Sequence, residues 1–195
     1  MKTIIDGLFK ENPVFKLALG LAPAVAVTTL AYNGLVLGIT TAVILLIAAV
    51  ISALLAKVIP STARPVLHIG ILAILTMGAH EILLGYDPQI VANLGIFLPL
   101  IVVNGFVLHS LAKSDDVVQA ALDAVGKGLG FLAALLLIGV VREFLAYGTV
   151  FGAVVLDLQL PLFALAASVP GGMVILGLLV ALYNSVTGQG GELND

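Results

Sequence analysis

Ionisable side chains are scarce in this chain, where Asp, Glu, Lys and Arg make up 10% of the residues. Those inside long apolar stretches are the first candidates for chemistry, because a charge within a membrane span is costly and often functional. Glu81, next to His80, is a candidate for an ion pathway; the alternative is an interfacial position, since Gly85 lies about one helical turn away. Arg142 and Glu143 are also neighbours, and adjacent helical residues do not face each other. We expect each of them at the membrane interface or against another helix or a partner chain.

Small polar side chains accompany two proline-containing interruptions of apolar runs. Thr28 and Thr29 follow Pro23, and Asn104 follows Pro99. Proline inside a helix removes a backbone hydrogen bond, and in lipid the freed groups must find partners in protein or in a water-filled cavity. Breaks at corresponding places in two halves of a membrane protein indicate a functional site. We predict that these residues frame a site near the membrane midplane, where the hydroxyl and amide groups either bind a ligand or satisfy the freed backbone groups.

Other kinds of site find little support in the sequence. The histidines, His68, His80 and His109, lack a metal-ligand spacing, and we expect them at the interface or in the core. The chain has no Ser/His/Asp set, phosphate loop or dinucleotide fingerprint, so we expect neither a catalytic residue nor a metal site in it. It has no cysteine, which excludes disulfides and cysteine-ligated zinc or iron–sulfur clusters held by this chain alone.

The composition is that of a polytopic helical membrane protein. Apolar residues make up 61% of the chain and the mean hydropathy is +1.23, whereas soluble domains are about 45–50% apolar and about 25% charged. A net charge of −3, without a basic cluster interleaved with aromatics, argues against nucleic acid as a partner. We predict a single integral domain over residues 1–195 in the lipid bilayer.

Apolar stretches of about 20 residues, the length that crosses a bilayer, predict six transmembrane helices. Their approximate ranges are 14–32, 35–56, 66–84, 90–111, 128–147 and 160–183. The residues between them are expected in turns and loops, including a turn at 32–34 and a polar loop at 57–65. The mixed segment at 148–159 is either a loop or a partly embedded segment. The glycine pair after Pro170 is expected to interrupt the sixth helix.

The most polar internal stretch, residues 112–127, is expected to be a loop. Ser114, Asp115 and Asp116 offer a helix N-cap before Val117, and Asp123 is expected to be solvated.

The positive charges predict an orientation. Seven of the eight Lys and Arg residues fall on one side of the six-helix topology, and only Arg142 falls on the other. The seven are Lys2, Lys10, Lys16, Lys57, Arg64, Lys113 and Lys127. Because cytoplasmic loops collect positive charge, we predict that both termini are cytoplasmic.

The two interrupted segments also indicate an internal repeat. LGLAPAVAVTT at 19–29 and LGIFLPLIVVNG at 94–105 share the order Leu-Gly, a short apolar gap, Pro, three residues, Val, and then Thr28 or Asn104. The halves then span approximately 14–84 and 90–183, and three helices per half would invert the second copy. The fold expected is an all-α membrane protein with an inverted 3+3 repeat and a broken first helix in each half. The alternative is chance similarity, since Gly and Pro are common in membrane helices.

With these segments in view, the chain resembles the six-helix membrane subunits of the Rnf and Nqr ion-translocating redox complexes. The Rnf E / Nqr D branch is the most similar. The matching stretches are GLFKENPVFKLALGLAPAVAVTT, LGIFLPLIVVNG, REFLAYGTVFG and VPGGMVILGLLVALY. The resemblance implies a multi-pass subunit of the prokaryotic inner membrane, in a complex that couples electron flow to Na⁺ or H⁺ transport. It also implies a homologous six-helix partner of opposite topology and further subunits of that complex.

The resemblance further implies an intramembrane [2Fe–2S] cluster, held by two cysteines from each of two paired subunits. Each broken helix of the family carries one of these cysteines. Ala22 and Gly105 occupy the two positions here. Neither has a donor side chain, so we expect no cofactor on this chain alone and a structural or ion-translocating role in place of an electron relay.

Two other interpretations stay open at this point. The chain is alternatively an engineered cysteine-less subunit, for which restoring both cysteines would restore the cluster. A third interpretation, from another class, is a stand-alone transporter of ions or small solutes built on the inverted repeat.

Overall fold

The computed structural model describes residues 12–56, 58–113, 116–156 and 163–187. These residues are mostly helical. The α-helices are α2 (Leu21–Ala26), α3 (Ala31–Leu55), α4 (Arg64–Tyr86), α5 (Pro88–Leu94), α6 (Gly105–Leu111), α7 (Val117–Tyr147) and α8 (Val169–Thr187). Short 3-10 helices are η2 (Ser61–Ala63), η3 (Gly95–Phe97), η4 (Pro99–Val103) and η5 (Ala164–Ala167), and the two strands are β1 (Thr149–Val150) and β2 (Ala153–Val154).

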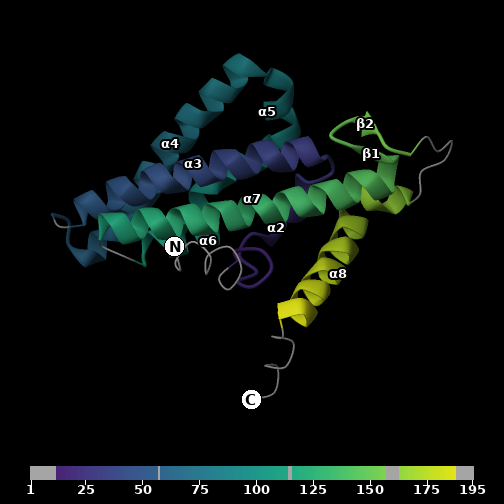
Figure 1. Ribbon diagram of the computed structural model, residues 1–195. Coiled ribbons are helices and arrows are strands. Elements are labelled where there is room, and N and C mark those ends of the chain that lie inside the picture. Colours follow the sequence, from purple (N-terminus) through teal and green to yellow (C-terminus); the bar gives the residue numbers. More distant parts are fainter. Residues whose placement is uncertain (1–11, 57, 114–115, 157–162, 188–195) are drawn as a thin grey trace.

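Helices α3 and α7 lie side by side and form the centre of the molecule (Figure 1). Small residues allow this close approach: a Cβ added to Gly139 of α7 would lie 2.9 Å from the Cα of Ala31, and one added to Gly34 of α3 would lie 2.9 Å from the carbonyl oxygen of Leu135. In Figure 1, α4 and α5 extend to one side of this pair, and α8 leaves the far end of α7 toward the other. The central pair therefore positions both halves of the chain.

Five stretches of the described chain are helical, long and apolar enough to cross a membrane. They are Ala31–Leu55, Ser61–Tyr86, Pro88–Leu111, Val117–Tyr147 and Val169–Val186. Together with the apolar helix α2, they account for the six expected segments, and the multi-pass helical class is confirmed. The inverted relation between the two halves stays a prediction.

The first expected span, 14–32, is wrong as a continuous helix. Before α3 begins at Ala31, only α2 is α-helical in this range, and Pro23 occupies its third position, where the missing N–H has no intrahelical partner to lose. Upstream, the side chain of Asn12 accepts the backbone N–H groups of Val14 and Phe15, which stabilises a turn there. The expected turn at 32–34 is also wrong, because α3 already begins at Ala31.

The fourth expected span is interrupted around Pro99, as predicted. The chain leaves α5 at Gly95, whose φ is +53°, and continues through η3 and η4. Asn104 is extended, with φ −67° and ψ 125°, before α6 begins. Gly95 suits this point because a residue without Cβ adopts positive φ at little cost.

The fifth span begins earlier than expected, at Val117. The predicted N-cap is confirmed for Asp116, whose carboxylate accepts the N–H of Gln119 at 3.3 Å; the other two residues of that cap, at 114–115, lie outside the described residues. The expectation of a solvated loop is wrong for Asp123, because this residue lies on α7 and is 5% exposed. The helix begins at its Asp116 cap even though the residues that follow are polar.

In the C-terminal half, the connection after α7 is a loop with a short hairpin, as one of its two expectations had it, while the expected interruption of the last span is wrong. The mixed segment after α7 contains an antiparallel hairpin in which Thr149 pairs with Val154, while 157–159 lie outside the described residues. Pro170 and its two glycines do not interrupt the last span but form the first turn of α8, where proline is tolerated. The beginning expected for that span, 160–162, is outside the described residues.

Candidate functional site

The two helix breaks meet at one cavity. It has a volume of about 210 Å³, and both interrupted segments line it. The lining residues are Leu19, Ala22, Pro23, Phe97, Leu100, Val103, Asn104 and Gly105. Segments that lie far apart in sequence are thus brought together at the positions that the repeated spacing singled out. The lining is almost entirely apolar.

Asn104 supplies the one polar side chain of this lining. Its Oδ1 atom is buried and makes no hydrogen bond within the described part of the chain. Its backbone is used at both ends, since its N–H donates to the carbonyl of Ile101 and its carbonyl accepts the N–H of Leu108. The Oδ1 atom is therefore a hydrogen-bond acceptor at this cavity that a ligand or a water molecule would satisfy.

The residues at the breaks do not fit an iron–sulfur cluster. Such clusters are held by cysteine thiolates, and Ala22 and Gly105 present a methyl group and a hydrogen atom. The backbone nevertheless has room for a side chain: a Cβ added to Gly105 would lie 3.4 Å from Leu19, which is ordinary van der Waals contact. The two breaks form a frame at which this chain supplies no sulfur ligand.

Thr28 does not line the cavity but binds a buried arginine. Arg142 is 0% exposed, and its Nη1 donates to the Thr28 hydroxyl at 3.0 Å and to the carbonyl of Val25. Thr28 in turn donates to the carbonyl of Ala24. The hydroxyl thus makes local hydrogen bonds at the end of α2, and a ligand-binding role for it stays a prediction. Thr29 is half-buried beside it.

The same guanidinium reaches a second segment. Its Nε donates to the backbone carbonyl of Ala166 at 3.0 Å. Its Nη2 donates to the backbone carbonyls of Ala167 at 3.4 Å and Ser168 at 3.1 Å. Arg142 therefore ties α7 both to the first helix break and to the η5–α8 connection. Sequence reasoning placed it at an interface or against another helix or partner; the structure shows it buried among elements of this chain.

The glycine pair at the start of α8 makes room for these contacts. A Cβ added to Gly172 would lie 2.8 Å from the guanidinium carbon of Arg142, and one added to Gly171 would lie 1.9 Å from the carbonyl oxygen of Leu165. The glycine pair was expected to interrupt the helix, but instead it packs closely against η5 and Arg142. This packing leaves no space for a side chain at Gly171 or Gly172.

Substituting Gly171→Ala is expected to destabilise the protein by about 3 kcal/mol, because the clash is with backbone and cannot be relieved by a rotamer change. The matched control is Gly177→Ala on the same helix, which meets nothing within 4 Å and should be neutral or slightly stabilising. Unfolding in mixed detergent micelles, followed by far-UV circular dichroism because the chain has no tryptophan, measures both. Equal stabilities for the two variants would contradict the packing.

Glu143 has a separate role on the same helix. It is 1% exposed, and its carboxylate accepts the N–H of Ala31 at 2.8 Å, the hydroxyl of Thr149 at 3.0 Å and the N–H of Gly152 at 2.8 Å. It therefore satisfies a free N–H at the start of α3 and holds the hairpin against α7. The sequence signal for Arg142 and Glu143 was their position inside an apolar run, which indicated burial but not partners.

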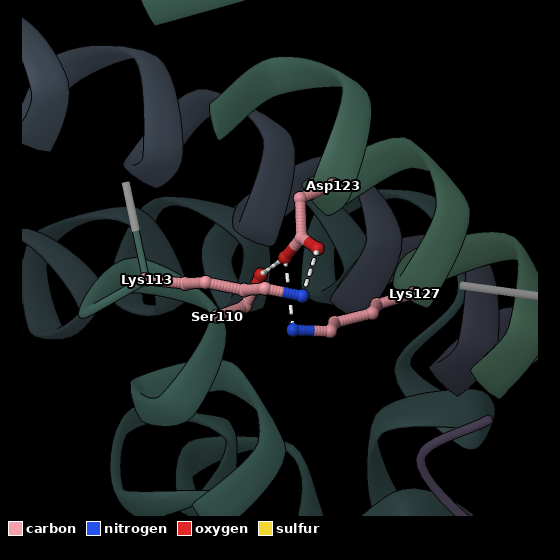
Figure 2. Close-up of polar contacts among 4 residues, drawn as sticks. All are labelled: Ser110, Lys113, Asp123 and Lys127. Carbon is pink, nitrogen blue, oxygen red and sulfur yellow. Dashed lines mark hydrogen bonds and ion pairs between the residues drawn. The ribbon is translucent and has the colours of Figure 1, made fainter. Parts of the chain in front are cut away.

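A third buried polar cluster lies near the start of α7 (Figure 2). The carboxylate of Asp123 contacts the ammonium of Lys127 at 2.9 Å and that of Lys113 at 3.3 Å, and accepts the hydroxyl of Ser110 at 2.8 Å. Lys127 is fully buried, while the side chain of Lys113 is 42% exposed. This Asp123 cluster links the end of α6, which follows the second break, to α7.

Glu81 lies apart from the cavity between the breaks. Its side chain is 59% exposed on α4, and a carboxylate oxygen is 3.6 Å from Nδ1 of His80. His80 lines a different cavity of about 290 Å³ together with Pro99 and with Thr76, whose hydroxyl is buried and makes no hydrogen bond to described residues. Pro99 is thus at a break but does not line the cavity that joins the breaks. An ion pathway through Glu81 stays a prediction.

Comparisons with known proteins cover nearly the whole chain. A family model described as "Rnf-Nqr subunit, membrane protein" matches residues 1–180. The E-type subunit of the Na⁺-translocating ferredoxin:NAD⁺ oxidoreductase complex of Acetobacterium woodii is 38% identical over 187 residues, covering 94% of this chain and 95% of that protein. The corresponding subunit of the proton-translocating ferredoxin:NAD⁺ oxidoreductase complex of Clostridium ljungdahlii is 32% identical, with coverages of 90% and 84%. The corresponding subunit of the ion-translocating oxidoreductase complex of Methanosarcina acetivorans is 34% identical, with coverages of 92% and 88%.

Proposed function

The chain belongs to the Rnf-Nqr family of membrane subunits, and from this premise we propose that it is the E-type subunit of an ion-translocating oxidoreductase complex. The related subunits come from complexes named for ferredoxin:NAD⁺ oxidoreduction coupled to Na⁺ or H⁺ translocation. The other subunits of such a complex are its partners. Within the complex, this chain is an integral, multi-pass component and houses no catalytic residue of its own.

We further propose that this chain has a structural or ion-translocating role and is not an electron relay. The observation that supports this role is the cavity between the two breaks. Ala22 and Gly105 face the same cavity, so the frame is present while no thiolate lines it. Electrons therefore pass through other subunits, and this chain contributes to the structure of the complex or to ion translocation. Asn104, with its buried unsatisfied oxygen, is the residue through which the cavity would bind a polar group.

Charge distribution supports the proposed orientation in the inner membrane. Arg64 begins α4, Lys113 follows α6, and Lys127 lies near the start of α7. Helices α3 and α6 end where α4 and α7 begin, and we name this region the basic end of the bundle. Because positive charge collects on the cytoplasmic side, the basic end is cytoplasmic, as are both termini. A homologous six-helix subunit of opposite topology pairs with this chain at the two breaks.

The test is cysteine restoration in the assembled complex. With a partner subunit that supplies two further cysteines, the double variant Ala22→Cys/Gly105→Cys is expected to gain a [2Fe–2S] signal in electron paramagnetic resonance after chemical reduction, because two thiolates return to one cavity, four ligands are then present, and the space at Gly105 admits a side chain. Each single variant is the matched control and should bind substantially less iron. Iron and acid-labile sulfide measured in the purified complex complete the comparison.

Two outcomes would count against the proposal. A stoichiometric [2Fe–2S] signal assigned to this subunit pair in the unmodified complex would show that the electron relay does not need these cysteines. A double variant that assembles normally with a cysteine-bearing partner but binds no iron would show that the two breaks are not a cluster frame.

A further inference from the structure

A larger cavity lies at the basic end of the bundle, separate from the breaks. Its volume is about 360 Å³, and it shares no lining residue with the cavity between the breaks. The residues around it come from the end of α3, from η2, from the start of α4 and from the end of α6. They are Ser52, Ala56, Ser61, Arg64, Pro65, His68, Ile69, Leu108, Leu111 and Ala112.

One wall of this cavity is polar and positively charged. Arg64 and His68 line it from one face of α4, where they are four residues apart, and Ser61 lines it from the preceding helix η2. The guanidinium is oriented by a bond from its Nη2 to the carbonyl of Ala56 at 3.0 Å. The first turn of α4 carries no acidic residue, and its N-cap makes no side-chain hydrogen bond. The positive end of the helix dipole and the positive charge of Arg64 therefore add together at this wall.

His68 is an independent indication of a ligand. The residue is 6% exposed and lines the cavity, yet its imidazole nitrogens make no hydrogen bond to any described residue. Neither ring nitrogen of His68 is a fully buried atom, so the donor and the acceptor of a neutral imidazole are open at the cavity that the residue lines. A ligand with hydrogen-bonding oxygens in the cavity would satisfy them.

Most of the remaining lining is apolar. It includes Leu108 and Leu111 of α6 and Pro65 and Ile69 of α4, and Ile69 is 43% exposed. A cavity with a cationic wall and a mostly apolar remaining lining, at the end of a membrane bundle, matches a group that is anionic at one end and aliphatic at the other. Basic pockets between helices at the membrane surface recognise anionic headgroups in this way.

We propose that this cavity binds an anionic phosphate group through Arg64, His68 and Ser61. Arg64 supplies the charge and N–H donors, His68 donates or accepts a hydrogen bond according to its tautomer, and Ser61 adds a hydroxyl. The apolar part of the lining favours a phospholipid headgroup over free phosphate as the source. Such a lipid would pack between α4 and α6 and would connect the two halves of the chain at the basic end.

The experiment uses the assembled complex in phosphatidylcholine nanodiscs that contain a trace of photoreactive phosphatidylglycerol. Cross-links are mapped by mass spectrometry to the segments 61–69 and 105–112. Arg64→Gln is expected to lower labelling of these segments about tenfold, because a charge-assisted hydrogen bond is lost. His68→Leu should lower it by a smaller factor. Lys16→Gln is the matched control, since it removes one positive charge from an exposed residue that does not line the cavity.

Competition on the unmodified complex keeps the test independent of how the variants fold. Unlabelled phosphatidylglycerol should displace the probe, and photoreactive phosphatidylcholine should label the same segments far less. Displacement by inorganic phosphate at comparable occupancy would support the phosphate site and assign free phosphate as its source. The proposal is overturned if phosphatidylcholine labels these segments as well as phosphatidylglycerol, or if Arg64→Gln, assembled normally, is labelled like the unmodified protein.

Discussion

Replacing Arg142 by methionine is expected to cost about 5 kcal/mol of folding stability or to prevent assembly of the subunit. Methionine has a similar length, so little volume is lost, but all the hydrogen bonds of the guanidinium disappear. The carbonyls of Val25 and Ala166 lose this donor where both hydrogen bonds are buried, and the carbonyl of the half-buried Ser168 loses it as well. Each unsatisfied buried group costs about 1–3 kcal/mol, and the losses accumulate.

The conservative variant Arg142→Lys separates hydrogen bonding from charge. A lysine keeps the positive charge but lacks the planar fork that reaches α2 and the η5–α8 connection at once, so we expect an intermediate loss. Lys16→Met, at an exposed position, is the control for removing a positive charge and should change stability little. Unfolding in mixed detergent micelles, with far-UV circular dichroism as the signal, ranks the series. A methionine variant as stable as the unmodified protein would contradict the role of Arg142 in joining α7 to the first helix break and to the η5–α8 connection.

Neutralising Asp123 is expected to cost about 3 kcal/mol. Asparagine preserves the shape and one acceptor, but it leaves the fully buried ammonium of Lys127 without its carboxylate, and removing one member of a buried pair is strongly destabilising. Unfolding of the Asp123→Asn variant, measured in the same micelles, gives the magnitude. The hydroxyl of Ser110 retains an acceptor, so the loss should stay below that of Arg142→Met.

Two companion variants make this prediction specific. Lys113→Gln should cost at most about 1 kcal/mol, because this lysine is nearly half exposed and solvent screens its charge. The double variant Asp123→Asn/Lys127→Met should recover most of the stability lost in Asp123→Asn, since it removes the buried uncompensated charge. A double variant less stable than the single one would instead show that Lys127 is held by other interactions and that the ion pair is secondary.

Much of the fold could be predicted from the sequence because the relevant forces are local. Apolar runs long enough to cross a bilayer indicate spans wherever they occur, and the spans beginning near 35, 66 and 90 correspond to helical stretches of the structure. Proline lacks an N–H in any context, so the departures from regular helix near Pro23 and Pro99 were also predictable. The boundary at Val117 was missed because a hydropathy window counts Asp123 and Lys127 as solvated, whereas their pairing keeps them within a helix.

By itself, the sequence determined that this is a multi-pass helical membrane protein with two proline-centred breaks and no cysteine at either. These conclusions depend on residue types and on spacing along one segment. Tertiary structure alone decided that Ala22 and Gly105 line one cavity, and that Arg142 binds the first break. The partners of a buried charge come from distant segments, such as Thr28 for Arg142 and Ala31 for Glu143. A one-dimensional pattern states that such a charge needs a partner, and only the packed chain specifies which one.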